Sequence, residues 1–181
     1  MPWDTNHKHQ SRQRILEAAA QLFVARGFDG VGIDDVMQQA NMTRGAFYSH
    51  FKSKSELYHE AIPVAGFIAK EQLEAGCSNS FNVLKHNYLN QHKGADDTQL
   101  CPIALLISDI RHRDPAIRET YEKVFAGFVE YINSHVNERS AALAQAATMI
   151  GAVALAQTLT DESLKAELLA ACEAATRCEQ D

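Results

Sequence analysis

Apolar residues recur at helical spacing along most of this chain. The first stripe, at positions i, i+4, i+7 and i+8 of a helix over residues 10–25, comprises Ile15, Ala19, Leu22 and Phe23. The second stripe, in a shorter helix, comprises Ile33, Val36, Met37 and Ala40. Thr43 is a favourable residue to begin a third helix, in which Phe47 and Phe51 face inward because they are four residues apart. Three short helices are therefore predicted before residue 52.

Six more helices are predicted in the rest of the chain. Their approximate ranges are 55–75, 81–92, 100–112, 115–137, 140–159 and 162–178, and polar stretches such as "GCSNS" and "HKGADDTQ" separate them. Pro63 lies inside the first of these helices, where it removes a backbone hydrogen bond and is expected to kink or break the helix. No alternating run is long enough to suggest a sheet. The chain is thus predicted to be all-α, with about nine helices.

Charged residues are unevenly distributed along the chain. The protein has 181 residues, 46% of them hydrophobic, and a net charge of −6, which is typical of a soluble globular protein. Up to residue 60, seven basic residues balance seven acidic ones, which leaves ten basic against sixteen acidic residues in the remainder. Two basic clusters lie in the N-terminal part: Lys8, Arg12 and Arg14, and then Arg44, Lys52 and Lys54. If they meet in space they form a positive face suited to a polyanion, although Arg12 and Arg14 are equally compatible with simple solvation.

The termini, the cysteines and one uncharged segment set further limits. The N-terminus has no apolar segment behind its charges, so no secretory signal and a cytoplasmic location are expected. Four cysteines without a CxxC pair predict reduced thiols, no metal and no cofactor. A metal site could alternatively be made from His86, His92, Cys101 and His112, but these residues have no recognised ligand spacing. Residues 140–160 carry no charge, but their many Ala, Gln and Thr residues favour a buried helix over a membrane span.

The second and third helices and their connection predict a DNA-binding unit. Two helices are joined by a tight turn, and the outer face of the second presents Arg44, Gly45, Tyr48, Ser49 and Lys52. This is the layout of a helix-turn-helix whose second helix enters the major groove of DNA. Gly45 suits that use, because a residue without a side chain lets the backbone approach bases or phosphates closely.

The segment "ILEAAAQLFVARGFDGVGIDDVMQQANMTRGAFYSHFKSKSELY" resembles the N-terminal DNA-binding domain of the TetR family of bacterial transcriptional regulators. Several elements occur in register, among them the A-x-x-L-F helix and T-x-G-x-x-Y-x-H-F-x-S-K-x-x-L. The resemblance implies that phosphates are contacted by Thr43, Tyr48, His50 and Lys54, while Arg44 and Gly45 lie nearest the base edges. Val31 and Gly32 stand where the family often has Thr and Ser, so the usual hydroxyl contact before the second helix is not expected.

The resemblance implies two domains, a DNA-binding domain over residues 1–54 and a ligand-binding and dimerisation domain over 55–181. The last two helices would form the homodimer interface. Small residues independently favour close helix approach in the first of them, at Ala147, Gly151 and Ala154, and the last helix offers Leu164 and Leu168. A ligand pocket is expected among Phe67, Phe81, Leu84, Tyr88, Cys101, Leu105, Tyr121, Phe125 and Phe128. The predicted function is a repressor that binds a palindromic operator in double-stranded DNA as a dimer and is released by a small, fairly apolar effector.

Cys101 provides the main alternative. The stretch "YLNQHKGADDTQLCP" resembles a subgroup of the family in which Cys-Pro begins a helix of the ligand domain. A thiol at a helix N-terminus can have a lowered pKa and sense oxidants or electrophiles, although a buried cysteine is more often an inert small hydrophobe. A cysteine enzyme using Asp109 and His112 is not expected, because His112 lies three helical turns from Cys101. An activator without a small-molecule ligand is a further alternative.

Overall fold

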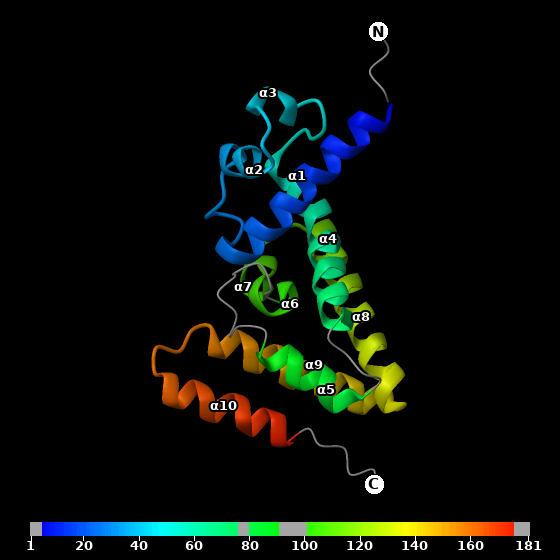
Figure 1. The fold of residues 1–181 in the computed structure, drawn as a ribbon, viewed down its shortest axis with the longest axis vertical. Coiled ribbons are helices and arrows are strands. Elements are labelled where there is room, and N and C mark those ends of the chain that lie inside the picture. The colour runs from blue at the N-terminus through cyan, green and yellow to red at the C-terminus, as the bar shows by residue number, and fades with distance from the viewer. Residues whose placement is uncertain (1–4, 76–79, 91–100, 176–181) are drawn as a thin grey trace.

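The computed structural model describes residues 5–75, 80–90 and 101–175, which contain ten helices and no strand, so the all-α prediction is confirmed. The helices are α1 (Thr5–Arg26), α2 (Ile33–Gln39), α3 (Arg44–Phe47), α4 (Lys54–Ala75), α5 (Phe81–Asn90), α6 (Pro102–Leu105), α7 (Ile107–Ile110), α8 (Pro115–Val136), α9 (Arg139–Ala156) and α10 (Glu162–Ala175). A head of α1 to α3 lies at one end of the molecule, and a body of α5 and α8 to α10 lies at the other, with α4 running between them (Figure 1).

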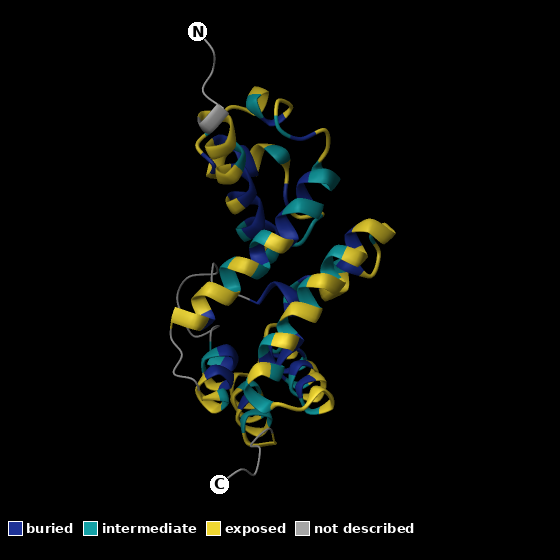
Figure 2. Ribbon diagram, turned by 90° about the vertical axis from the view of Figure 1, so that its right-hand side faces the viewer, coloured by how far each residue is buried: buried dark blue, intermediate teal, exposed yellow. Residues whose placement is uncertain are grey.

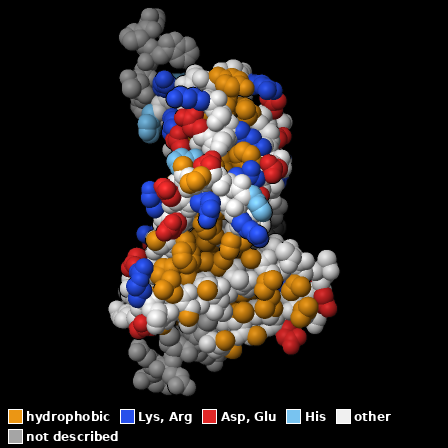
Figure 3. Space-filling model, turned by 180° about the vertical axis from the view of Figure 1, so that it is seen from behind, with side chains coloured by type: hydrophobic (Ala, Val, Ile, Leu, Met, Phe, Trp, Pro, Cys, Tyr) orange, Lys and Arg blue, Asp and Glu red, His pale blue; other side chains and the backbone are white. Residues whose placement is uncertain are grey.

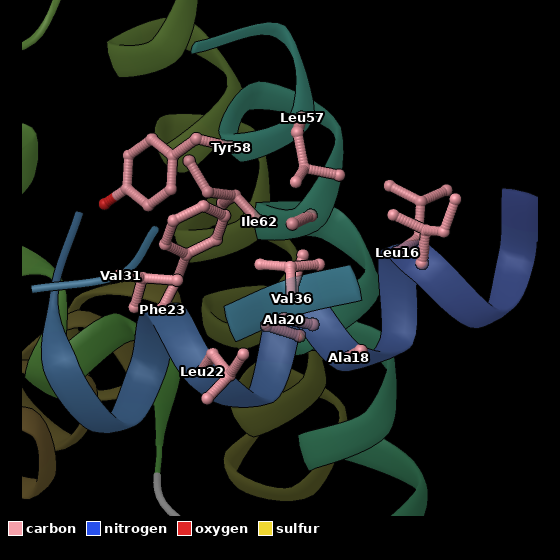
Figure 4. Close-up of a cluster of buried hydrophobic side chains, with 14 of the residues drawn as sticks. Leu16, Ala18, Ala20, Leu22, Phe23, Val31, Val36, Leu57, Tyr58 and Ile62 are labelled. Atoms are coloured by element: carbon pink, nitrogen blue, oxygen red, sulfur yellow. The ribbon is translucent and has the colours of Figure 1, made fainter. Parts of the chain in front are cut away.

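The head is built around α1, which packs along α4 and against α2. Its most deeply buried side chains include Ile15, Phe23, Phe47 and Phe51, each no more than 1% exposed. Burying side chains of this size stabilises a fold by about 1.5–3 kcal/mol each. Figure 4 shows how Phe23 and its neighbours from α1 and α2 meet side chains of α4 in this core.

Asn41 makes the turn between α2 and α3. Its φ of 53° lies in the left-handed region, which Asn tolerates better than most residues. The Asn41 N–H donates to the Gln38 carbonyl (3.0 Å), and the Met42 N–H reaches back to the Met37 carbonyl (2.8 Å). These two bonds are the paired C-terminal cap of a Schellman motif, with Met42 packed against the head core. The turn therefore fixes the direction in which the chain enters α3.

The third helix is shorter than predicted. α3 ends at Phe47, and the chain continues as a turn in which the Ser49 and His50 N–H groups donate to the carbonyls three residues before them, at 3.3 and 2.9 Å. The tighter turn brings the ring centroids of Phe47 and Phe51 to 5.7 Å in the core. Conversely, α1 is longer than predicted and begins at Thr5.

The helix predicted over residues 100–112 is wrong as a continuous element, because it breaks at Leu106 between α6 and α7. The Leu106 N–H donates to the Pro102 carbonyl, while the Leu106 carbonyl accepts from Ile110, so one residue ends α6 and begins α7. Ile103 of α6 belongs to the body core, whereas Leu106 and Ile110 belong to the head core. The break lets one short segment pack into both cores.

α4 also contributes to both cores. Its first half, including Leu57 and Tyr58, packs in the head core, and Leu73 near its end packs in the body core. Pro63 does not break α4, which is one helix from Lys54 to Ala75, but it cannot donate the usual hydrogen bond to the carbonyl of His59. Figure 2 shows the buried positions gathered where the helices face one another in the head and in the body.

α9 is the central helix of the body. Within the described part of the chain it is the one helix long and apolar enough to cross a membrane by length and composition. Its contacts are those of a core helix, because it packs against α5, α6, α8 and α10. The residues it buries are Ala142, Ala146, Met149, Ile150, Ala152, Val153 and Ala156.

Candidate nucleic-acid interface and body cavity

The α3 segment, which is α3 with its flanking residues from Thr43 to Lys52, presents a polar, exposed surface to solvent. Thr43 is the N-cap residue of α3, and its side chain makes no cap hydrogen bond, so the hydroxyl is available to an outside partner. Tyr48 is 60% exposed and rests edge-on against Phe47, with ring centroids 5.1 Å apart. Ser49 and Lys52 are exposed as well, although the Ser49 hydroxyl donates to the carbonyl of Ala46 (2.7 Å). These side chains are thus exposed along α3 and the turn that follows it.

Gly45 has no structural reason to be glycine in this protein. Its φ is not in the left-handed region, and a Cβ placed on it would meet no atom within 4 Å. Glycine inside a helix is less favourable than alanine by about 1 kcal/mol. The packing of the protein therefore does not require glycine at this position.

Arg44 is held by an acidic residue of the preceding helix. Its Nη1 lies 2.6 Å from Oδ2 of Asp34, and both side chains are more than 60% exposed. Exposed pairs of this kind contribute about 0–1 kcal/mol, so a stronger acceptor can replace Asp34. The pair places Arg44 at the α2–α3 surface.

His50 and Lys54 are more enclosed than the other predicted contacts. The Nδ1 atom of His50 is buried without a hydrogen-bond partner, and burial lowers the pKa of His50, with a further lowering from the positive charges of Lys8 and Arg12. The Nζ atom of Lys54 lies 4.2 Å from the centroid of the Phe28 ring. Lys54 therefore makes a cation–π contact within the protein.

Arg12 and Arg14 make contacts within the protein. Arg12 forms an ion pair with Glu60 of α4 and lies over the ring of Phe51, 4.8 Å from its centroid. Arg14 donates to the carbonyl of Ala40 at the end of α2, at 2.5 Å. Both guanidinium groups thus join α1 to its neighbours in the head.

A cavity of about 660 Å³ opens between α4, α5, α6 and α8. Its volume lies within the range of small-molecule sites. The apolar part of its lining includes Pro63, Phe67, Leu73, Ile103, Val124 and Phe128, and the ionisable or polar part includes His59, Glu60, Lys70, Thr120, Lys123 and Tyr131. Figure 3 shows hydrophobic side chains gathered at mid-height on the rear face of the molecule, with Lys and Arg side chains beside them.

Two glycines shape this cavity. Gly66 brings α4 close to α8, since a Cβ on it would come within 2.7 Å of Cγ1 of Val124. Gly127 of α8 lines the cavity, and a Cβ there would meet nothing within 4 Å, so its missing side chain leaves space. The two helices therefore touch at Gly66 and leave an open volume beside Gly127.

The structure brings together four of the nine side chains predicted for the pocket: Phe67, Tyr88, Cys101 and Phe128 line the cavity. The other five lie outside its lining. Leu84 is fully buried in the body core, Phe81 and Phe125 pack against that core, Leu105 is half-buried, and the Tyr121 hydroxyl donates to the Ile103 carbonyl at 2.5 Å. Sequence reasoning missed the polar residues and glycines of the lining. They recur at helical spacing, with His59, Gly66 and Lys70 in α4 and Thr120, Lys123, Gly127 and Tyr131 in α8.

Cys101 does not have the environment of an activated thiol. It is 4% exposed and accepts a hydrogen bond of 2.8 Å from the hydroxyl of Tyr88. Burial raises the pKa of Cys101, although the bond from Tyr88 and two backbone bonds oppose that rise. Because desolvation dominates, the pKa shift fits the inert buried cysteine that the sequence favours over a sensing thiol.

The described residues give no support to the enzyme and metal alternatives. The Asp109 carboxylate accepts a hydrogen bond from the N–H of Phe28, whereas the Cys101 sulfur accepts one from the Tyr88 hydroxyl, so the two side chains have different partners. Among the described residues, no three His, Cys, Asp or Glu side chains form a group that could hold a metal ion, and His92 lies outside the described residues.

The predicted dimer residues form a partly open face on α9 and α10. Ala147 is exposed and Leu164 is 48% exposed, while Gly151, Ala154 and Leu168 are half-buried. Leu143 and Leu155 of α9 are also exposed, at 40% and 54%. Several large apolar side chains are thus left uncovered on the last two helices.

The head matches a known protein family. Residues 15–61 match the family model described as bacterial regulatory proteins, tetR family. The head is therefore a TetR-family DNA-binding segment. The matched residues run from the middle of α1 to the first part of α4 and include α2 and α3. TetR-family regulators are DNA-binding transcription factors and not enzymes, as the sequence predicts for this chain.

Two curated relatives match part of the chain. The chain is 44% identical over 53 residues to the HTH-type transcriptional regulator SrpR of Pseudomonas putida, covering 29% of this chain and 25% of that protein. It is 34% identical over 70 residues to the probable acrEF/envCD operon repressor of Escherichia coli (strain K12), covering 37% of this chain and 32% of that protein. The chain therefore spans about a quarter to a third of the length of these relatives.

The fold of the chain has a known counterpart over nearly its whole length. It is similar to the crystal structure of a TetR-family transcriptional regulator from Cytophaga hutchinsonii, with a TM-score of 0.80 and 16% identity over 96% of each chain. At this identity the likeness concerns the fold of head and body.

Proposed function

We propose that this chain is a ligand-responsive, DNA-binding transcriptional regulator of the bacterial cytoplasm, and most simply a repressor. One observation carries the proposal: Glu60 lines the body cavity, and its carboxylate binds Arg12, which lies over the Phe51 ring at the end of the α3 segment. A molecule in the cavity can therefore contact Glu60, and Glu60 in turn holds the Arg12 side chain that joins α1 to the end of the α3 segment.

On DNA, the α3 segment enters the major groove with the Gly45 backbone close to the bases. Phosphates bind Thr43, Tyr48 and Lys52, whose polar groups face solvent in the free protein. Arg44 leaves Asp34 for an acceptor on the DNA, because the exposed pair holds it only weakly. Lys54 contributes through its backbone N–H at the start of α4, where the helix dipole favours a phosphate, while its ammonium group stays on Phe28.

Two copies are needed for this binding mode, because one recognition segment in one half-site gives modest affinity. The uncovered leucines and small residues of α9 and α10 support a two-fold interface in which four helices meet. The two heads then read a palindrome whose half-sites lie about 34 Å apart along the duplex.

Release by a ligand follows from differential binding to two arrangements of head and body. A ligand that fills the cavity next to Glu60 favours an arrangement in which the Arg12 contact is weakened. α4 lacks one backbone hydrogen bond at Pro63, which lines the same cavity, so the helix can bend there at a lower cost. The bend changes the separation of the two heads, and one of them leaves its half-site.

The proposal is tested with DNA from the region upstream of the protein's own gene, by fluorescence anisotropy at low salt. The wild-type protein should bind a fragment of this region, and Lys52→Ala should reduce the slope of log affinity against log salt by about one. Arg118→Ala, which removes a charge from α8 in the body, is the matched control. Absence of binding to any such fragment would refute the regulatory assignment.

The coupling step needs its own variant. Glu60→Gln removes the charge that holds Arg12, so it should weaken DNA binding about ten-fold in the absence of ligand, as an added effector would. Arg12→Met should have a similar effect, and the double variant should be no weaker than either single one, because both remove one interaction. Unchanged affinity in Glu60→Gln would mean that the cavity does not act through this pair.

A further inference from the structure

The charged groups around the cavity are not balanced. Among the residues that the structure describes, three cationic or protonatable side chains line it, Lys70, Lys123 and His59, and Glu60 contributes the one carboxylate. That carboxylate already binds Arg12, so it adds no free negative charge. The charge left over at the cavity is therefore positive.

Lys123 is the most available of these cations. It is exposed on α8, lines the cavity, and forms no ion pair within the part of the chain that the structure describes. Lys70, on α4 across the opening, lies 3.5 Å from Glu74 and 5.6 Å from the ring centroid of Tyr131. Both contacts are exposed and weak, so Lys70 can turn toward a better partner.

A hydrogen-bond donor lies on the same side of the cavity. The Thr120 hydroxyl and Nε2 of His59 are 2.6 Å apart, and both residues line the cavity. When Nε2 of His59 carries the proton and donates it to Thr120, the hydroxyl proton of Thr120 is free to donate to a ligand. A negatively charged ligand group favours this tautomer.

We infer that the cavity binds an organic anion, a molecule with an apolar body and one carboxylate-like group that Lys123 and Lys70 neutralise. The apolar body lies against Phe67, Phe128 and the side of α8 at Gly127, where no side chain occupies the space. A cationic ligand is disfavoured because both lysines repel it and Lys70 already lies near the face of Tyr131. The inference rests on the proposed function only in assigning the cavity to the effector.

Three matched probes test the charge preference by isothermal titration calorimetry on the full-length protein: 2-naphthylacetate, 2-naphthylethanol and 2-naphthylethylamine. They share one ring system and differ in the charge of the side group. The anion should bind at least about ten-fold more tightly than the alcohol, and the amine should bind most weakly. Equal or tighter binding of the alcohol or the amine would overturn the inference, as would no binding of any probe.

Two variants test whether Lys123 causes the preference for the anion. Lys123→Met should lower the affinity for 2-naphthylacetate about ten-fold and leave the affinity for 2-naphthylethanol unchanged. Arg118→Met removes the same charge from the same helix, but Arg118 does not line this cavity, so both affinities should stay as in the wild type. Anion affinity that survives both Lys123→Met and the double variant Lys70→Met/Lys123→Met would contradict the assignment.

The same probes separate the ligand class from the regulatory role. If 2-naphthylacetate binds in a Lys123-dependent way but leaves DNA binding unchanged, the anion site is supported and ligand-controlled release is refuted. If the alcohol and the anion release DNA equally effectively, ligand control is supported and the anion inference is refuted.

Discussion

The carboxylate of Asp109, in α7, accepts a hydrogen bond of 2.6 Å from the backbone N–H of Phe28 in the turn after α1. Gly27 makes this approach possible, since its φ is 69° and a Cβ there would lie 2.8 Å from Oδ2 of Asp109. Arg113 joins the same contact, with its guanidinium 4.2 Å from the Phe28 ring centroid and 3.1 Å from Asp29. The body therefore holds the head at the α1–α2 turn as well as through α4.

Replacement of Asp109 should loosen this second attachment. Asp109→Ala leaves the Phe28 N–H without its acceptor, so the free energy of unfolding should fall by about 1–3 kcal/mol. Urea unfolding followed by circular dichroism measures the change. Glu119→Ala, an exposed acid of α8, serves as the control and should stay within about 0.5 kcal/mol of the wild type. Equal stability of the two variants would show that the contact contributes nothing.

Gly45 separates stability from DNA binding. Gly45→Ala adds a methyl group that meets no atom of the protein, so the variant should be as stable as the wild type or more stable by up to about 1 kcal/mol. The same methyl group lies between the backbone and DNA, and operator affinity should fall at least about ten-fold. Gly127→Ala, which also has open space in a helix but lies in the body, should gain stability and keep its operator affinity. Unchanged DNA binding by Gly45→Ala would remove Gly45 from the interface.

The stability of the head should depend on pH through His50. Burial, together with Lys8 and Arg12, lowers the pKa of His50 in the folded protein, so the unfolded chain takes up this proton at a higher pH than the folded one. The free energy of unfolding should therefore fall as the pH decreases below about 6.5, the ordinary pKa of histidine. Between about pH 7.5 and pH 5.5, the free energy of unfolding should fall less in His50→Gln than in the wild type. Parallel pH profiles of the two proteins would exclude His50 as the cause.

The thiol of Cys101 should react slowly in the folded protein. The thiolate is the nucleophile, and burial both raises the pKa of Cys101 and hides its sulfur behind Tyr88. Alkylation by iodoacetamide at pH 7.5, followed by peptide mass spectrometry, should be at least about 100-fold slower in native protein than in urea. In addition, Cys101→Ala should leave ligand-induced release of DNA intact. Rapid native alkylation combined with loss of release in Cys101→Ala would instead support the thiol sensor.

The head could be predicted in detail because its signals are local. The apolar spacing in α1 and α2, the N-cap at Thr43 and the exposed face around Tyr48 all follow from residues within one or two helical turns. What the sequence could not reveal were the partners of Arg12 and Lys54, since Glu60 and Phe28 lie 48 and 26 positions away along the chain. Whether a cation faces DNA or its own protein depends on those tertiary contacts.

The cavity was harder to predict for a related reason. Aromatic residues were the expected lining, yet Phe81 and Phe125 pack into the body core, as apolar side chains do wherever a core accepts them. The more informative signal was the mixture of glycine and polar residues on one face of α8, at Thr120, Lys123 and Gly127. In this bundle of apolar helices, the helical face that carries small and polar residues is the one that lines the cavity.

The sharing of one core between α1 to α4 and the α6–α8 segment has a consequence for engineering. Leu106, Ile110 and Ile117 are each no more than 6% exposed, and they pack against residues that belong to the DNA-binding end. A chimaera that joins residues 1–54 to another regulator's sensing module would lack these three side chains, together with Leu57 and Tyr58 of α4, so the core around Phe23 would be incomplete. A transplant that carries residues 1–75 and the 102–117 segment would retain the buried residues of this core.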